Sequence, residues 1–572
     1  MKTAKLITLF IVAFITTTNA FAQQNVQKID SLMKQYYAYG QFNGTVLVAE
    51  KGKIIYEKGF GQANMEWAIP NQTDTKFRIG SVTKQFTATL ILQLVEEGKI
   101  KLDGNLSDYL PDYRKDTGEK ITVHQLLNHT SGIPSYTNRP DFFAEVSRDP
   151  YSVADFVKKF ASGDLEFEPG TKFNYNNSGY FLLGAIIEKV TGKSYETVIT
   201  ERIFKPLGMS NSGYDNQAPI LQKRANGYQK TPAGYINAPY LDMSLPFAAG
   251  SLYSTVDDLF KWDQSLYEDK ILSAESKKLM FTPGRSTYGY GLVISDQPIG
   301  KTDKKTKIIS HGGGINGFNC LITRAVDKRQ TVIILDNVGL GQHHGKITNS
   351  IIGILNGQPA ESPKRSIAES LYKIVIEKNA ATAVAEYRKL KAANSPTFDF
   401  AEGELNTLGY QLLGMKRTKD AIEIFKLNVE MFPNSANPYD SLGEAYLADD
   451  QKDLALANYK KASELDPKNT NALQIINRLE GKETKVDPAV FDAYVGDYEL
   501  GPNFILTISK DGDKLFGQAT GQRKFQLDAI SETQFTVPTV KANISFEKDS
   551  AGKVIGLVLA QGGQNIKAKK VK

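Results

Sequence analysis

The pattern of apolar and polar residues predicts strands near both ends of the first 357 residues. Two apolar, β-branched runs, Thr45 to Ala49 and Ile54 to Lys58, flank the turn sequence Glu50-Lys51-Gly52 and predict a hairpin. Three more strands are predicted late in this stretch: Lys307 to Ser310, Phe318 to Arg324 and Thr331 to Asp336. Strands at both ends with helices between them predict an α/β (α+β) domain. Its antiparallel sheet is completed by N- and C-terminal pieces, and a helical subdomain is inserted.

Two segments between these strands have the pattern of buried helices. Gln85 to Val95 is apolar on nearly every face and is followed by Gly98, a residue that commonly ends helices. Tyr180 to Val190 is similarly apolar. A helix that is apolar all round is expected in the centre of a domain. The residues directly before each helix are therefore expected to have fixed positions, because a buried helix follows them.

A second segment repeats with a period of 34 residues. Four features of one unit recur in the next: Leu408-Gly409, Ala421, Phe425 and Pro433 become Leu442-Gly443, Ala455, Tyr459 and Pro467. This period and pattern resemble tetratricopeptide repeats, which are pairs of helices. Because about three units are needed for stability, the helical run Ala368 to Lys391 is predicted to be a degenerate first unit.

The last segment reads as short strands separated by turns. The predicted strands are Tyr494 to Leu500, Phe504 to Ser509, Lys514 to Ala519, Ile544 to Lys548 and Val554 to Ala560. They predict a small all-β barrel or sandwich, which serves either as a packing module or as a ligand contact. The predicted domains are residues 23–357, a linker at 358–365, all-α repeats at 366–482 and the β domain at 486–572.

The N-terminus has the features of a secretory signal peptide at residues 1–22. Lys2 and Lys5 precede the apolar run Leu6 to Ile15, and Ala20-Phe21-Ala22 is a small-x-small cleavage site. A buried N-terminal helix is the alternative. No later apolar run reaches eighteen residues, so no membrane span is expected. The mature chain is therefore predicted to be secreted or periplasmic.

Composition narrows the possible partners. The formal net charge is 69 − 63 = +6 over 572 residues, which gives no case for nucleic-acid binding. The single cysteine, Cys320, excludes an internal disulfide and is expected to be a small buried hydrophobe. No cluster of His, Cys or carboxylate residues has metal-ligand spacing, so neither a metal nor a cofactor is predicted.

Ser81-Val82-Thr83-Lys84 offers a nucleophile and a base at the start of the first apolar helix. Residues three apart lie on one helix face, and a lysine in an apolar site can have its pKa lowered enough to take a proton from a hydroxyl. The spacing alone is weak. Three other pairs share it: Ser31 with Lys34, Ser370 with Lys373, and Ser550 with Lys553.

Two further motifs distinguish Ser81 from the other three serines. Tyr175-Asn176-Asn177 offers a phenol and an amide just ahead of the second apolar helix. His311-Gly312-Gly313-Gly314 follows the strand Lys307 to Ser310, and glycines at a strand edge let a substrate approach the backbone closely. His129, in Leu126-Leu127-Asn128-His129, is expected to be a framework hydrogen bonder rather than a catalyst.

The ordered set Ser-x-x-Lys, Tyr-x-Asn and His-x-Gly resembles the serine β-lactamase and penicillin-binding-protein superfamily, in its class C branch. The resemblance covers about residues 27 to 356, judged on flanking segments as well as on the motifs. The flanking segments are Phe77-Arg78-Ile79-Gly80, the run from Leu126 to Gly132, the run from Ala249 to Thr255, and Gly313 to Phe318.

The resemblance implies a role for each motif. Ser81 would be the nucleophile that forms an acyl-enzyme, with Lys84 and Tyr175 sharing the proton transfers, and the choice of acylation base stays open. Asn177 would orient the substrate and the lysine. The backbone N–H groups of Ser81 and Gly314 would form an oxyanion hole. These roles need no metal and no cofactor.

The resemblance implies a serine hydrolase acting on an amide or ester, and the predicted signal peptide makes it an exported one. Its substrate is a small molecule or peptide, with a D-amino-acid-containing cell-wall peptide as one candidate. His311 stands where K-T-G enzymes have lysine, and a neutral imidazole anchors a carboxylate less strongly than an ammonium. This favours a peptidase, of the DD-peptidase or D-aminopeptidase type, or an esterase over a β-lactamase, which stays as an alternative. A second alternative is a binding module whose helical repeats take a protein or peptide partner.

Overall fold

The chain divides into two compact units, the first holding most residues up to Lys364 and the second running from Arg365 onward. The computed structural model describes residues 23–139, 142–300, 302–339, 343–480, 486–501, 504–537, 542–549, 552–561 and 564–571. The predicted signal peptide, residues 1–22, lies outside these described residues. Within the described ranges no helix is both long and apolar enough to cross a lipid bilayer.

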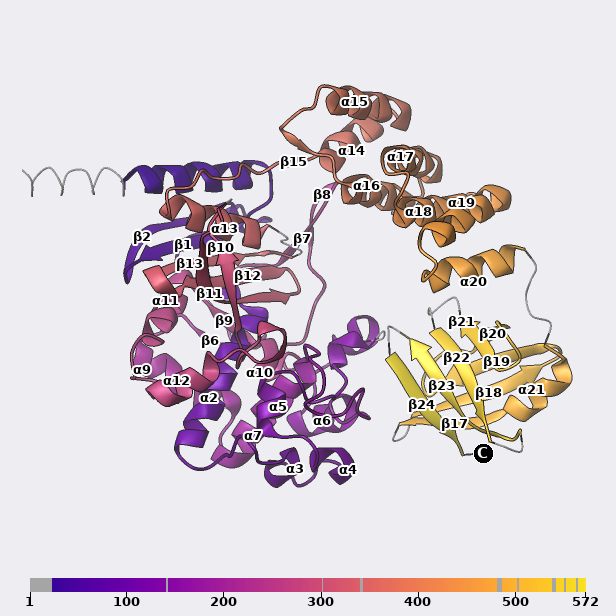
Figure 1. Ribbon diagram of the computed structural model, residues 1–572, viewed down its shortest axis with the longest axis horizontal. Helices are drawn as coiled ribbons and strands as arrows, with labels where there is room; N and C mark the ends of the chain where they lie inside the picture. Colours follow the sequence, from indigo (N-terminus) through magenta and orange to yellow (C-terminus); the bar gives the residue numbers. More distant parts are fainter. Residues whose placement is uncertain are drawn as a thin grey trace, which may run out of the picture. The chain divides into compact units, whose positions relative to one another are not determined.

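A six-stranded antiparallel sheet organises the first unit, in the order β10-β11-β12-β13-β1-β2 (Figure 1). Its strands are β1 (Gly44–Glu50), β2 (Lys53–Gly59), β10 (Val293–Pro298), β11 (Lys305–Ile315), β12 (Phe318–Ala325) and β13 (Gln330–Asp336). The N-terminal strand β1 pairs with the late strand β13, from Gly44 opposite Asp336 to Glu50 opposite Gln330. The predicted sheet, completed by pieces from both ends of the domain, is confirmed.

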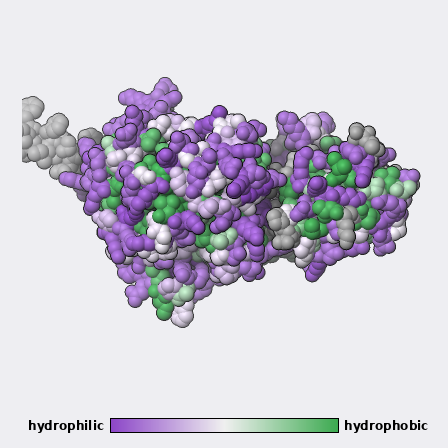
Figure 2. Space-filling model, turned by 90° about the horizontal axis from the view of Figure 1, so that it is seen from below, coloured by the Kyte–Doolittle hydropathy of each residue, from purple (hydrophilic) through white to green (hydrophobic). Residues whose placement is uncertain are grey.

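Helices bury one face of this sheet. The helix at residues 23–38 and α13 (His344–Leu355) share a hydrophobic core with alternate residues of β1 and β13 (Figure 1). Val46 and Val48 face this core, as do Val332 and Ile334. This alternation is the one expected of strands, whose successive side chains point to opposite faces. The face of the molecule in Figure 2 is mostly hydrophilic, with hydrophobic residues in separate patches.

The inserted helical subdomain lies between β2 and β10 in the chain. Its central helices are α2 (Thr83–Glu96) and α7 (Asn177–Thr191), with α5 (Val123–Leu127) and α10 (Phe247–Gly250) beside α7. Most residues of α2 and α7 are buried, as their apolar sequences predict. Both helices start before the apolar runs that predicted them, since polar Lys84 and Asn177 lie in their first turns.

The helical part of the second unit consists of consecutive helix pairs. The helices are α14 (Ile367–Glu377), α15 (Ala380–Ala392), α16 (Glu402–Gly414), α17 (Thr418–Met431), α18 (Ala436–Ala448), α19 (Lys452–Leu465) and α20 (Thr470–Leu479). The 34-residue period has a packing cause. A Cβ at Gly409 would lie 2.4 Å from the Phe425 ring, and one at Gly443 would lie 2.9 Å from the Tyr459 ring. Each glycine therefore allows the aromatic ring of the second helix in its pair to pack directly against the backbone of the first helix.

The C-terminal segment forms a closed eight-stranded barrel, which resolves the choice between barrel and sandwich. Its strands are β17 (Gly496–Gly501), β18 (Phe504–Asp511), β19 (Lys514–Ala519), β20 (Phe525–Ala529), β21 (Gln534–Val537), β22 (Ala542–Lys548), β23 (Val554–Gln561) and β24 (Gln564–Lys570). The sequence pattern missed β20, β21 and β24, together with the short helix α21 (Pro488–Tyr494). The prediction that Tyr494 begins a strand is wrong, because Tyr494 ends α21 and its ring stacks on Phe546 in the barrel core.

A buried ion pair fastens α11 (Val256–Ser265) to the sheet. Arg324 on β12 donates from Nε to Asp263 Oδ1 at 2.8 Å, and Thr331 on β13 donates to Oδ2 at 2.8 Å. Both charged side chains are buried. Such a pair contributes little more stability than a well-packed apolar pair would, but removing one partner leaves a buried charge without its counter-charge.

We therefore expect Arg324→Met to lower the free energy of unfolding of the first unit by about 3–5 kcal/mol. Urea unfolding followed by tryptophan fluorescence measures this unit alone, because the only tryptophans of the chain are Trp67 and Trp262. Lys193→Met, which breaks the exposed pair with Glu201, is the matched control and should leave the midpoint near that of the parent. Equal midpoints for the two variants would contradict the expectation.

Candidate active site

Ser81 lies in a tight turn between a short strand and a buried helix. β5 (Phe77–Arg78) leads into the 3₁₀ turn η1 (Gly80–Val82), and α2 follows directly. The backbone N–H of Ile79 donates to the Leu252 carbonyl at 2.9 Å, which holds the turn to β9 (Leu252–Ser254). The nucleophile candidate is thus fixed on both sides by regular structure.

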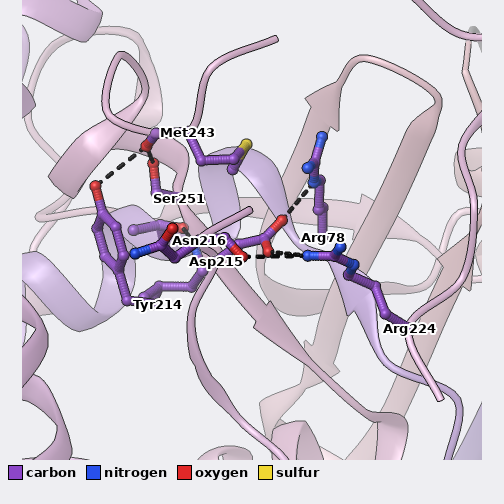
Figure 3. Close-up of polar contacts among 9 residues, drawn as sticks. Arg78, Tyr214, Asp215, Asn216, Arg224, Met243 and Ser251 are labelled. Atoms are coloured by element: carbon purple, nitrogen blue, oxygen red, sulfur yellow. Dashed lines mark hydrogen bonds and ion pairs between the residues drawn. The ribbon is translucent and has the colours of Figure 1, made fainter. Parts of the chain in front are cut away.

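A charged cluster anchors the strand that enters this turn (Figure 3). Asp215 is fully buried and accepts from Arg78 Nε at 2.5 Å and from Arg224 Nη1 at 2.9 Å. The Asp215 backbone N–H donates to the Ser251 carbonyl at 2.7 Å. The Asp215 carboxylate therefore ties Arg78 of β5, three residues before Ser81, to Arg224, and the Asp215 backbone ties both to the segment that carries Ser251.

Lys84 has its terminal nitrogen surrounded by three oxygens from different parts of the chain. Nζ lies 3.0 Å from Ser81 Oγ, 2.8 Å from Asn177 Oδ1 and 2.8 Å from the Ala249 carbonyl oxygen. The amide and carbonyl oxygens can only accept, so they take two N–H groups. A neutral amine then has its lone pair left for the Ser81 hydroxyl.

The environment of Lys84 favours that neutral amine. The residue is 0% exposed. Burial lowers the pKa of its amine well below the usual value of 10.5, because the charged form loses its hydration. The ring centroid of Tyr175 lies 5.0 Å from Nζ and that of Tyr180 lies 5.6 Å away, so aromatic faces form the rest of the pocket.

Tyr175 and Asn177 reach the same point from the start of α7. Asn176 caps this helix, accepting from the Gly179 backbone N–H at 2.8 Å, so the residues on either side of it have fixed backbones. Tyr175 is 36% exposed, so part of its side chain faces solvent. Burial of the phenol raises its pKa above 10, and a hydrogen bond with Ser81 opposes that rise. Tyr175 is therefore a neutral phenol beside Ser81.

The His311–Gly314 motif lies within β11, not after its end as the sequence pattern predicted. β10 pairs with β11 only from Lys305 to Ser310, whereas β12 pairs along the other edge from Ile308 to Ile315. Beyond Ser310, the edge of β11 that no longer pairs with β10 lies beside the turn that carries Ser81. A Cβ at Gly313 would lie 2.0 Å from the Ile79 carbonyl oxygen, and one at Gly80 would lie 3.0 Å from the Gly314 carbonyl oxygen. The approach at Gly313 requires glycine, and Gly80 combines its close approach with a φ of +48°, which also favours glycine.

His311 is buried at 5% exposure, with both ring nitrogens engaged. Nδ1 donates to the Gly312 carbonyl at 2.6 Å, so Nε2 is unprotonated and accepts from the Tyr288 hydroxyl at 2.8 Å. Burial lowers the pKa of this imidazole to about 3, because the charged form loses its hydration. The His311 ring is therefore neutral at physiological pH and carries no charge toward a substrate.

The structure brings together Ser81, Lys84, Tyr175 and Asn177, places the glycines of β11 beside the Ser81 turn, and sets the His311 ring centroid 6.3 Å from that of Tyr175. Sequence reasoning missed Tyr288 and the Ala249 carbonyl. Tyr288 carries a weak signal, since Tyr288-Gly-Tyr-Gly precedes a strand. A backbone carbonyl has no sequence signal. Among the described residues no group of three His, Cys, Asp or Glu could hold a metal ion.

Cys320 is buried, as expected, but it also makes a specific contact. Its thiol donates to the Ile79 carbonyl oxygen at 2.9 Å. That carbonyl oxygen is the atom against which Gly313 packs. The thiol therefore supports the junction between β11, β12 and the Ser81 turn.

Two family models match the chain. The beta-lactamase model matches residues 29–348, and a model described as a domain of unknown function (DUF3471) matches residues 480–570. The chain is also 34% identical over 372 residues to penicillin-binding protein 4* of Bacillus subtilis (strain 168), an alignment that covers 60% of this chain and 79% of the relative.

Solved structures resemble the chain as well. A D-amino acid amidase from Ochrobactrum anthropi SV3 is 26% identical, with a TM-score of 0.50, covering 59% of this chain and 99% of the amidase. An octameric penicillin-binding protein homologue from Pyrococcus abyssi shares the fold at 22% identity, with a TM-score of 0.51, covering 95% of this chain and 100% of that one. With the beta-lactamase model spanning residues 29–348 and the sheet and helices arranged as above, this chain belongs to the beta-lactamase family and is a serine hydrolase of the penicillin-binding-protein fold.

Proposed function

We propose that Ser81 attacks the carbonyl carbon of an amide or ester and forms an acyl-enzyme, with Lys84 as the base. The contact of Lys84 Nζ with Ser81 Oγ at 3.0 Å, on an amine whose two other contacts are pure acceptors, is the observation that carries this proposal. The serine proton moves to the lysine lone pair as the new C–O bond forms.

Tyr175 acts as the proton relay in this scheme. Burial pushes the pKa of Lys84 down and that of Tyr175 up, which separates a base from an acid at one site. The phenol gives its proton to the leaving amine or alcohol as the C–N or C–O bond breaks, and recovers a proton from Lys84. In deacylation the neutral Lys84 takes a proton from the attacking water as the new C–O bond forms. Tyr175 gives its proton to Ser81 Oγ as the acyl C–O bond breaks, and then recovers a proton from Lys84.

The backbone N–H groups of Ser81 and Gly314 form the proposed oxyanion hole. Gly80 packs against the Gly314 backbone, which brings the turn that carries Ser81 beside the strand edge that carries Gly314. Backbone donors of this kind are held in place before the reaction, so they stabilise the tetrahedral oxyanion without reorganising. Gly313 supports the arrangement by allowing β11 to lie against the Ile79 carbonyl.

The substrate we propose has no carboxylate next to the β11 edge. His311 is neutral and its two nitrogens are engaged by Gly312 and Tyr288, so it provides no positive charge there. This supports an amidase, peptidase or esterase, and D-amino-acid amides fit the name of one structural neighbour. The predicted export would give access to cell-wall peptides, so D-Ala-D-Ala peptides belong in the same screen.

The first test is a substrate panel assayed with the parent chain and with Ser81→Ala. The panel holds p-nitrophenyl esters, D-amino-acid amides, D-Ala-D-Ala peptides and a chromogenic cephalosporin. We expect turnover of an ester or D-amino-acid amide that falls at least about 10⁴-fold in Ser81→Ala, since covalent catalysis is lost. Turnover that persists in Ser81→Ala would overturn the proposal. Fast cephalosporin hydrolysis would favour the β-lactamase alternative.

The second test is the pH dependence of kcat/KM for the best substrate. Only the neutral amine of Lys84 accepts a proton, so kcat/KM should be low at acid pH and rise as Lys84 deprotonates. Since burial lowers the pKa of this amine, the midpoint should lie well below 10.5. Because the pKa of Tyr175 is raised, no decline should follow below pH 10. An acid limb that is unchanged in a residually active Lys84→Met would contradict this assignment.

The third test places a charge at position 311. His311→Lys supplies an ammonium where K-T-G enzymes have one, and a charge-assisted hydrogen bond of about 1.5–3 kcal/mol predicts about 10- to 100-fold faster acylation by benzylpenicillin. The stopped-flow or gel-based acylation rate measures it. His311→Gln keeps the site uncharged and is the control. Equal penicillin rates for the two variants would contradict the proposed role of charge at this position.

A further inference from the structure

His129 brackets Tyr175 with two hydrogen bonds. Its carbonyl oxygen accepts from the backbone N–H of Asn174 at 2.9 Å, and its ring Nδ1 accepts from the backbone N–H of Asn176 at 3.1 Å. These are the residues immediately before and after Tyr175. One residue from the turn after α5 thus fixes the backbone on both sides of the catalytic phenol.

The His129 ring also packs directly on the Tyr175 ring. Their centroids lie 4.4 Å apart, and the Tyr288 and Tyr180 rings lie 4.6 Å and 5.1 Å from the same imidazole. His129 is 1% exposed, so its ring fills the space behind the phenol. With the backbone held at two points and the ring supported from behind, Tyr175 has little freedom to turn away from Ser81.

The backbone of His129 adopts a left-handed conformation, which allows both hydrogen bonds to form. Its φ is +61°, in the left-handed region that residues with a side chain rarely adopt. Such conformations persist where the surrounding structure requires them, and they cluster at functional sites. Here the left-handed turn lets the carbonyl oxygen and the ring nitrogen of a single residue face the same short segment.

The protonation state of the His129 imidazole indicates a structural role and not proton transfer. Nδ1 accepts the Asn176 N–H, so the ring proton is on Nε2, which is buried with no hydrogen-bond partner in the described part of the chain. Burial lowers the pKa of this imidazole well below its usual value, because the charged form loses its hydration. A neutral ring whose N–H has no acceptor among the described residues is suited to packing and not to proton transfer.

We propose that His129 is a positioning residue that holds the Tyr175 phenol against Ser81 through two backbone hydrogen bonds and a ring contact. The inference rests on the proposed function, since it assigns a support to the proton relay. The contacts of His129 with this part of the site are to Asn174, Tyr175 and Asn176, so it acts through Tyr175. Its loss should therefore reduce proton transfer while substrate binding is kept.

The test compares His129→Asn with His129→Phe in the full chain. Asparagine tolerates the left-handed backbone but removes the ring, whereas phenylalanine keeps a ring against Tyr175. We expect kcat to fall about 10- to 100-fold in His129→Asn with KM within about twofold, since small misplacements of a catalytic group have effects of that size. His129→Phe should lose less, within about tenfold. His124→Asn, a histidine on α5 that bonds Tyr290 and Asn128, is the matched control and should keep the parent kcat.

A second readout does not need activity. 3-Fluorotyrosine placed at position 175 should give narrow fluorine signals in the parent and in His124→Asn, and broadened or additional signals in His129→Asn. Unchanged signals, or a kcat within twofold of the parent, in His129→Asn would overturn the proposal. A parent chain that turns over no ester or amide would refute the proposed function, and the fluorine signals alone would then decide whether His129 orders Tyr175.

Discussion

The burial of one lysine amine is the constraint on which the rest of the site depends. A fully buried ammonium costs several kcal/mol in lost hydration, so Lys84 must either find acceptors or lose its proton. Asn177 at the start of α7 and the Ala249 carbonyl of α10 supply two acceptors, and Ser81 is the third neighbour. The same three contacts that make the burial tolerable leave a lone pair facing the nucleophile.

The scaffold serves to bring these groups from distant parts of the chain to one place. The sheet joins strands from both ends of the catalytic unit, so β11 lies beside a turn more than two hundred residues earlier in the sequence. Gly313 permits the close approach, the Asp215 carboxylate holds the strand that enters the turn, and Cys320 bonds the Ile79 carbonyl. Each of these contacts acts on backbone position and not on the chemistry itself.

Much of this could be predicted from sequence because the decisive signals are local or periodic. The spacing of Ser81 and Lys84 and the apolar helices behind them follow from helix geometry, and the 34-residue period is visible in the recurring Leu-Gly, Ala, aromatic and Pro positions. The contacts of Lys84 with a carbonyl and of Tyr288 with His311 could not be predicted, since they arise from tertiary packing. The full length of β11 was not predicted because consecutive glycines weaken a strand pattern, although Gly313 is required by its close approach to the Ile79 carbonyl. The barrel strands β20, β21 and β24 are short or polar.

The central claim is that a neutral Lys84 activates Ser81, and mapping the covalent adduct tests it most directly. The parent chain and Lys84→Met are treated with a fluorophosphonate, and the modified peptide and its rate of formation are read by mass spectrometry. The account predicts one adduct, on Ser81, formed at least about 10²-fold more slowly in Lys84→Met, as expected when a general base is removed. An adduct on another residue, or the same rate in both proteins, would contradict it.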